Sequence, residues 1–566
     1  MQLHTADLFV LMFYFVIIAS IGFWASRKIK SSADFFMPRR FGKAMMIMHT
    51  FGTGTHSDQA VSVASKSFSN GLSGIWYQWL WLPVTPFYWL IAPLFRRFRA
   101  ITTSDVFEAR FSPSVAMLFA FVGMLNLAVN IGVMLKGSSA VVYASTGGLV
   151  SSNITIAIMT VMFVIYGMAG GLSAAIITDF IQGILTIIFS IILLPFVLKA
   201  VGGLGGIRES IKDPGMLSLV APAEIGFFYI SVIAFNALVG IVTQPHTMGN
   251  CAAGKTEMEG RIGFMFGSFI KRFCTIAWCL IGVAGVVYLA GRDVEPDHVF
   301  GVIAGDFLPK ILPGVLGLFL AALLASVMSS CDSFMIASSG LFTENIYKRL
   351  IPGKGQKHYV FVARAASLVI VGGGVGFAYW LPSVVKGLEI FWMIPPMMGI
   401  VFWLGLFWRR TTVAGAWAAT LTGFGVWWLT TRSFFVSFIN NFPEAQSLRF
   451  VVERNTGPEI YLPWQMVFYL TGGLLAGIIV SLLTKPVAKE KLDNFYALIR
   501  TPIKQGEKVP AACTLPVDAV VPEKRNIFPN TSLEIPIPSV TSVLGFIAGW
   551  VFVGIIIYSV YLIAAA

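Results

Sequence analysis

Charged residues are scarce in this chain. Only 12% of its 566 residues are Asp, Glu, Lys or Arg, whereas 56% are apolar. An ordinary soluble domain carries about 25% charged residues, so this composition cannot cover the surface of a soluble protein of the same length. Apolar runs of about 20 residues, the length that crosses a bilayer, recur along most of the chain. The composition therefore excludes a soluble, disordered or fibrous protein and predicts a polytopic membrane protein.

Paired cysteines and nucleotide-binding loops are also missing from the sequence. None of the five cysteines forms a C-x-x-C pair, so neither a zinc site nor a redox pair is indicated. No Walker A pattern occurs, so ATP is not the expected energy source. His56 beside Ser57 and Asp58 is the one local arrangement that resembles a nucleophile and base. A buried histidine in a polar helix more often packs or contacts a solute, so we do not expect an enzyme.

The apolar runs predict about 14 helical spans, separated by short polar segments. The first run follows Asp7 and precedes Arg27 and Lys28, which is the reverse of the charge order in a signal peptide. We therefore expect an uncleaved first helix whose N-terminus lies outside. The predicted spans cover residues 6–25, 43–70, 72–95, 114–145, 150–169, 171–200, 224–243, 262–290, 310–345, 358–382, 386–408, 411–432, 464–484 and 539–563.

The distribution of positive charge supports this topology. The chain has 40 Lys and Arg against 27 Asp and Glu, a net charge of +13. Alternating sides from an outside N-terminus places every basic cluster on the cytoplasmic side, as the positive-inside rule requires. The clusters lie at 27–30, 96–99, 348–357, 409–410 and 485–525. The excess charge thus indicates a multi-pass protein of the cell or inner membrane with both termini outside, and no nucleic-acid partner.

The second predicted span contains a polar run, Phe51–Gln59, near its middle. It holds Gly52, Gly54 and several hydroxyl or charged side chains, which cannot all face lipid. An unwound stretch would explain the run, because its freed carbonyls could bind a cation and its half-helix dipoles could face a solute. The alternative is an unbroken polar helix buried against other helices.

A face of serines marks the ninth predicted span. Ser326, Ser329, Ser330 and Ser333 recur at spacings of three and four residues and so share one helix face. Asp332 adds a carboxylate beside them, and Asp179 lies about two turns inside the sixth span. Hydroxyl, carbonyl and carboxylate oxygens form a hard shell that suits an alkali cation better than zinc. The alternative is a small-residue face for helix packing.

Two other features point to a polar solute. Gln78 stands between Tyr77 and Trp79 in the third span, where the rings could stack on a solute or could simply form an interfacial aromatic belt. Lys271 lies about ten residues inside its span, too deep for easy snorkelling to the surface. Buried ionisable groups of this kind are costly in a membrane and so need a function.

Taken together, these segments resemble the sodium:solute symporter family. The matching stretches are Ile101–Phe111, Tyr166–Gln182, Ala325–Tyr347 and Phe402–Arg410. The resemblance implies an all-α protein with a leucine-transporter-type core of two inverted five-helix repeats, at 43–200 and 224–408. An extra N-terminal helix (1–42), further helices (409–484), an irregular cytoplasmic linker (485–538) and a last helix (539–566) would surround that core.

The same resemblance implies particular binding residues. A sodium site would use the carbonyls of Gly52, Thr55 and Ser326 and the hydroxyls of Ser329 and Ser330. A possible second sodium site would use Asp179, Ser329, Asp332 and Ser333, and solute contacts would come from Gln59, Gln78, Asn236 and Lys271. Trp81 and Leu388 replace polar residues expected at sugar-contacting positions, while Asp58 and Glu389 add charge nearby.

The expected function is sodium-coupled import of a small polar organic solute by alternating access. A sugar-like molecule, an amino acid and an organic acid all fit the residues. Sodium is the expected coupling ion, with no organic cofactor and no obligatory protein partner. A cation channel and a proton-coupled solute transporter are the alternatives. The glycine-interrupted span favours alternating access over an open pore.

Overall fold

The computed structural model describes residues 4–26, 37, 39–221, 224–454, 457–507, 509 and 511–565. Helices make up 74% of the structure, which confirms the expected all-α class. The α-helices are α1 (Thr5–Ser26), α3 (Lys43–Thr53), α4 (Ser57–Asn70), α5 (Trp76–Trp79), α6 (Thr85–Arg97), α7 (Thr103–Arg110), α8 (Pro113–Ser145), α9 (Ser152–Ala200), α10 (Gly203–Ser210), α11 (Phe227–Ile241), α12 (Thr247–Ala252), α13 (Glu257–Tyr288), α14 (Val299–Phe307), α15 (Val315–Phe342), α16 (Lys348–Leu350), α17 (Gln356–Trp380), α18 (Val384–Met393), α19 (Pro395–Phe407), α20 (Val413–Thr430), α21 (Ser433–Asn440), α22 (Leu462–Leu483), α23 (Lys489–Arg500) and α24 (Val540–Ala565).

Short elements complete the structure. Four are 3-10 helices, η1 (Gly71–Ile75), η2 (Pro214–Leu217), η3 (Pro296–His298) and η4 (Leu308–Lys310), and η5 (Thr343–Tyr347) is a π-helix. The strands β1 (Val451–Arg454) and β2 (Gly457–Ile460) form a small antiparallel hairpin.

Eight helical stretches in the described part of the chain are long and apolar enough to cross a membrane. They are Pro113–Ser145, Asp179–Ala200, Glu257–Tyr288, Val315–Leu350, Gln356–Trp380, Val384–Phe407, Leu462–Leu483 and Val540–Ala564. The polytopic character expected from the sequence is therefore confirmed. The total of 14 spans stays a prediction, because several of the remaining runs are shorter or interrupted in the structure.

Helix α9 differs from the sequence-based expectation. The sequence predicts two spans that meet near residue 170, whereas the structure has one helix of 49 residues. At 1.5 Å per residue this helix is about 74 Å long, more than twice the thickness of a hydrocarbon core. Gly170 and Gly171 lie at the predicted boundary and do not end the helix, because glycine lowers helix stability by only about 1 kcal/mol relative to alanine and keeps its backbone hydrogen bond.

Two breaks interrupt helices that bear on function. The first separates α3 from α4 at residues 54–56, as the polar run predicts. The second separates α11 from α12 at residues 242–246, where the predicted span 224–243 ends. Pro245 is the local signal for this second break, because proline cannot donate a helical hydrogen bond.

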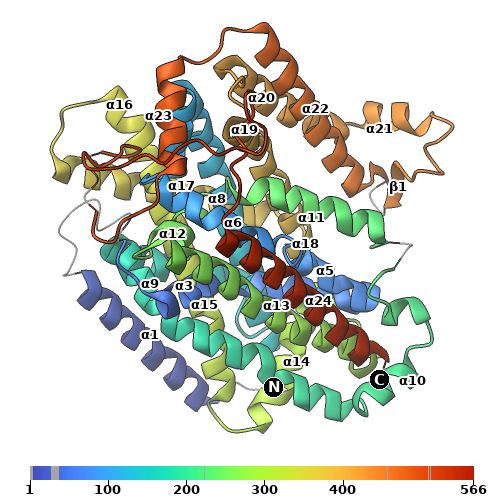
Figure 1. The fold of residues 1–566 in the computed structure, drawn as a ribbon. Coiled ribbons are helices and arrows are strands. Elements are labelled where there is room, and N and C mark those ends of the chain that lie inside the picture. The colour runs from blue at the N-terminus through green and yellow to red at the C-terminus, as the bar shows by residue number, and fades with distance from the viewer. Residues whose placement is uncertain are drawn as a thin grey trace.

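Glycines let α13 and α8 approach the broken helix closely. A Cβ on Gly263 would lie 2.6 Å from Met46 Cβ, and one on Gly267 would lie 2.6 Å from the Ile47 carbonyl oxygen. A Cβ on Gly137 would lie 2.5 Å from Asp58 Cα. Helix α15 packs against α8 and α9 on the other side of the broken helix, while α1 lies beside α9 (Figure 1). The α3–α4 break is therefore enclosed by helices.

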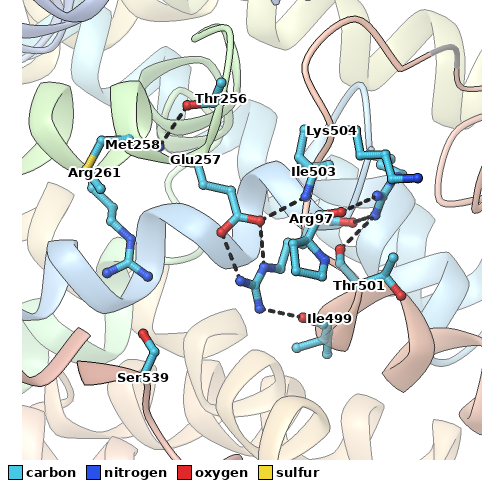
Figure 2. Close-up of polar contacts among 12 residues, drawn as sticks. Arg97, Thr256, Glu257, Met258, Arg261, Ile499, Thr501, Ile503, Lys504 and Ser539 are labelled. Carbon is cyan, nitrogen blue, oxygen red and sulfur yellow. Dashed lines mark hydrogen bonds and ion pairs between the residues drawn. The ribbon is translucent and has the colours of Figure 1, made fainter. Parts of the chain in front are cut away.

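The segment 485–538, expected to be irregular, contains α23 and crosses between the ends of several helices. We call its described residues the C-terminal strap. The Arg97 guanidinium forms hydrogen bonds of 2.8 and 2.9 Å to the Glu257 carboxylate and one of 3.1 Å to the Ile499 carbonyl oxygen. Figure 2 shows these contacts, together with the Ile503 amide that donates to the same carboxylate. Through Ile499 of α23 and Ile503, the strap is thus attached to α6 and α13.

Near the C-terminal end of the strap, the Glu534 side chain binds Arg409, which lies just after α19. Its carboxylate accepts hydrogen bonds of 2.8 Å from Arg409, 2.9 Å from Lys524 and 2.9 Å from Asn526. Burial by itself would raise the pKa of the Glu534 carboxyl, but these three hydrogen bonds outweigh it and hold the pKa below its ordinary value of 4.5. A carboxyl group with a lowered pKa stabilises the folded state above that ordinary value and loses this effect as the pH falls through the folded value.

We expect acid to loosen this end of the strap. Amide hydrogen exchange of peptides covering 525–538 should be slow at pH 7 and, after correction for intrinsic rates, faster below about pH 4.5. The E534Q variant should exchange quickly at both pH values, because a neutral amide cannot replace the carboxylate. Protection that stays equal from pH 7 down through the lowered pKa of Glu534 in the unmodified protein would contradict this assignment.

Candidate functional site

The backbone between α3 and α4 leaves the helical conformation within three residues. Gly54 lies at the C-terminal end of α3, and His56 is extended, with φ of −141° and ψ of 170°. The carbonyl oxygen of Gly54 accepts a hydrogen bond of 2.9 Å from Gln59 Nε2 and a second hydrogen bond from Lys271 Nζ. The break therefore presents backbone oxygens to groups outside the helix, as expected for a cation or solute site.

Helix α15 places its serine face against this break. The Ser330 hydroxyl lies 3.2 Å from the Gly52 carbonyl oxygen, 3.4 Å from that of Thr53 and 3.1 Å from that of Ser326. The Thr55 hydroxyl is buried and has no hydrogen-bond partner among the described residues. The structure thus brings Gly52, Ser326 and Ser330 together across two helices, with Thr55 in the adjoining turn.

Asp179 of α9 forms the centre of a second polar cluster. Its carboxylate accepts a hydrogen bond from Ser329, lies 2.6 Å from His49 Nδ1 and lies 3.4 Å from the Thr53 hydroxyl. Ser329 therefore faces Asp179 in this structure, while its neighbour Ser330 faces the broken helix. The side chain of Asp332 lies outside the described part of the structure.

Sequence reasoning did not find His49. This histidine lies one helical turn before Thr53 on α3, and its Nδ1 is 3.2 Å from the Thr53 hydroxyl. His49, Thr53 and Ser333 line the same cavity, which has a volume of about 40 Å³. The Ser333 hydroxyl has no hydrogen-bond partner in the described structure. An ionisable side chain within a predicted span was the available signal for His49.

The residues expected to contact the solute fall into two groups. Lys271 and Arg272 are consecutive on α13; Lys271 reaches Gly54, and Arg272 donates to the Gln78 carbonyl oxygen at 2.6 Å. The break and Gln78 therefore contact the same turn of α13. Three buried acceptor atoms, Asp58 Oδ2, Gln59 Oε1 and Gln78 Oε1, lack a hydrogen-bond partner within the described ranges.

Asn236 and Glu389 belong to the second group, which surrounds α18. The Asn236 amide donates to the Trp392 carbonyl oxygen at 3.0 Å and accepts from the Tyr469 hydroxyl at 2.5 Å. The Tyr77 hydroxyl donates to Glu389 at 2.8 Å, and its ring centroid is 5.2 Å from that of Trp392. Tyr77, next to Gln78, thus connects this group to α5.

Of the aromatic members of this second group, Tyr77 was named from the sequence, whereas Trp392 and Tyr469 had no distinguishing signal beyond their position in apolar runs. The hydroxyl groups of Tyr469 and Tyr77 hold Asn236 and Glu389, and both amide atoms of Asn236 have protein partners. Arg272 was also missed as a site residue, although it carries the same signal as Lys271, a charge within an apolar run. The structure places Asn236 and Glu389 with α18 and α22, and it does not show them at the break.

Positive charge is concentrated at the α13 side of the break. Lys271 and Arg272 are 8% and 2% exposed. Neither takes part in an ion pair with a carboxylate in the described structure, and Asp58 hydrogen bonds instead to His56. Buried charges are normally paired or bound to a ligand, so the region around Lys271 favours a ligand that carries negative charge or several acceptor oxygens.

A broken membrane helix that faces hydroxyl groups on a second helix, with buried polar side chains beside it, is typical of ion-coupled secondary transporters. The comparisons agree with this class. Residues 35–423 match the model of the sodium:solute symporter family. This match covers more than half of the chain, so the chain belongs to that family, and the resemblance found in the sequence is confirmed.

Two relatives match most of the chain. The sodium/pantothenate symporter of Escherichia coli (strain K12) is 25% identical over 475 residues, covering 77% of this chain and 93% of the relative. The osmoregulated proline transporter OpuE of Bacillus subtilis (strain 168) is 27% identical over 532 residues, covering 85% and 96%. These relatives are transporters, and sodium-coupled solute transport is the function of the family.

The fold also agrees with a solved structure. A Na⁺-coupled sialic acid symporter, in a substrate-bound outward-open state, superposes with a TM-score of 0.68 at 19% sequence identity. The match covers 86% of this chain and 99% of that protein. The leucine-transporter-type fold expected from the sequence is thus confirmed.

Proposed function

We propose that this chain imports a small polar solute together with sodium, and that sodium binds between α3 and α15. The proposed ligands are the carbonyl oxygens of Gly52, Thr55 and Ser326 and the hydroxyls of Ser329 and Ser330. The supporting observation is the Ser330 hydroxyl, which lies within 3.4 Å of carbonyl oxygens from both helices. Hard oxygen ligands without histidine or cysteine suit an alkali cation.

Sodium at this position would join two helices that the protein can move apart. Its binding favours the state in which α15 contacts the break, and the solute then binds beside the break. One sodium ion moving inward through about 100 mV releases about 2.3 kcal/mol, and a tenfold sodium gradient adds about 1.4 kcal/mol. A single ion can therefore support a solute gradient of several hundred-fold.

The proposed solute site lies where α4, α5 and α13 meet. Lys271 supplies positive charge, and Gln59, Gln78 and Asp58 supply the acceptor atoms that have no partner among the described residues. A solute that carries a carboxylate and hydroxyl or amino donors fits this set better than a neutral hydrocarbon. Asn236 and Glu389, held by Tyr469 and Tyr77, would bound the site on the α18 side.

Membrane placement completes the proposal. We infer from the basic clusters, by the positive-inside rule, that both chain ends lie on the outer side of the cell or inner membrane.

A thermal-shift screen of the purified protein tests the proposal. Sugars, amino acids and organic acids are each added in sodium chloride and in choline chloride of equal ionic strength. We expect one solute to raise the melting temperature in sodium and to have little effect in choline, because binding to the folded state stabilises it. Equal stabilisation in both salts would contradict sodium coupling.

A further inference from the structure

The buried contact between His49 and Asp179 has no role in the sodium and solute sites proposed above. Asp179 is fully buried, and both of its carboxylate oxygens already have protein partners. The resemblance to the family assigns this aspartate to a possible second sodium site. The surroundings of Asp179 decide whether such an ion is needed.

The separation of 2.6 Å between His49 Nδ1 and Asp179 Oδ2 requires a proton between these atoms. An ionised carboxylate only accepts hydrogen bonds, so His49 must then donate; a neutral carboxyl group would donate to His49 instead. In both arrangements the proton occupies the side of Oδ2 that a cation would use. The Thr53 hydroxyl, 3.4 Å from the same oxygen, adds another donor.

The remaining sides of Asp179 are also closed. The Ser329 hydroxyl donates to Oδ1. Gly52 packs so tightly here that a Cβ on it would lie 3.1 Å from Asp179 Cβ. A buried carboxylate is costly unless it is paired and hydrogen-bonded, and these residues already satisfy that requirement.

We propose that the His49–Asp179 pair replaces a second coupling cation, so that the protein binds one sodium ion per transport cycle. This inference rests on the proposed sodium site between α3 and α15. It makes His49 the residue that determines ion stoichiometry. It leaves Asp179 as a positioning residue that holds Ser329 beside the ion-binding Ser330.

The cavity beside His49 gives the inference a testable consequence. Its volume of about 40 Å³ has room for a water-sized particle, and it is lined by His49, Thr53 and Ser333. Removal of the imidazole would join this cavity to Asp179 Oδ2. A cation could then reach the Asp179 carboxylate and the Ser333 hydroxyl, which has no partner within the described structure.

The experiment counts sodium ions on the purified full-length protein by equilibrium binding of ²²Na⁺ in a scintillation proximity assay. We expect one ion per chain at saturation in the unmodified protein and two in H49A. The double variant H49A/D179N should return to one ion, because the new ligand is lost. D179N alone should also bind one ion at saturation. This variant tests the inference even if H49A does not fold.

His246→Ala is the matched control. His246 lines the same cavity but lies against the Phe334 ring, with centroids 4.8 Å apart, so this variant should bind one ion. Two ions on the unmodified protein, or one ion on a folded H49A, would overturn the inference. No ion on the unmodified protein would instead refute the proposed sodium site, so the two failures are distinguishable.

Discussion

Replacing Ser330 with alanine is expected to weaken sodium binding by roughly 10- to 100-fold. The hydroxyl contacts carbonyl oxygens of both α3 and α15, so its removal takes away an ion ligand and a link between the helices. Loss of such a buried polar contact costs about 1–3 kcal/mol, and 1.4 kcal/mol corresponds to a factor of ten. The measurement is ²²Na⁺ affinity, with the sodium dependence of the melting temperature as a second readout.

The double variant S329A/S330A should lose saturable sodium binding and sodium-dependent stabilisation altogether. Ser338→Ala is the control, because that buried serine lies on the same helix and hydrogen bonds within it, 2.9 Å from the Met335 carbonyl oxygen. Unchanged sodium affinity in the double variant would place the ion elsewhere.

Replacing Lys271 with methionine is expected to remove the response to solute while sodium still binds. The ammonium group contacts the Gly54 carbonyl oxygen and is the buried cation that faces the break. We expect solute affinity to fall more than tenfold, since hydrogen bonds to charged groups contribute about 1.5–3 kcal/mol each. The assay is the solute-induced thermal shift in sodium, alongside ²²Na⁺ binding.

The protein should tolerate this substitution. Methionine keeps most of the side-chain volume and removes a buried charge that has no ion-pair partner in the described structure, and such a charge is costly to bury, so the melting temperature without solute should not fall steeply. Lys199→Met, at the exposed end of α9, serves as the control. A full solute response in K271M would remove Lys271 from the binding site and with it the argument for an anionic or oxygen-rich solute.

Much of the candidate site could be predicted because its signals are local. Two glycines within a polar run predicted the α3–α4 break, since lipid cannot satisfy exposed backbone groups. Serines spaced three and four residues apart on α15 predicted a common face by helix geometry alone. Both features lie in single segments of sequence, and both are present in the structure.

The contacts that fix the detailed geometry could not be predicted in this way. His49 and Asp179 are separated by 130 residues, and no periodic pattern links them. Asn236 is held by Tyr469, 233 residues further along the chain. Helix α23 had a local signal that was overlooked, because its buried apolar residues recur at helical spacing, at 492, 495, 496 and 499.

The packing of α24 has a consequence for how the protein is made. The Trp89 indole of α6 donates to the Thr541 carbonyl oxygen at 2.9 Å, and Arg261 of α13 donates to the Ser542 hydroxyl at 3.0 Å. These two partners are synthesised 452 and 281 residues after the side chains that need them. Unsatisfied polar groups are costly in lipid. The Trp89 and Arg261 side chains therefore obtain these partners only once α24 has been made, and removal of α24 would leave both side chains without them.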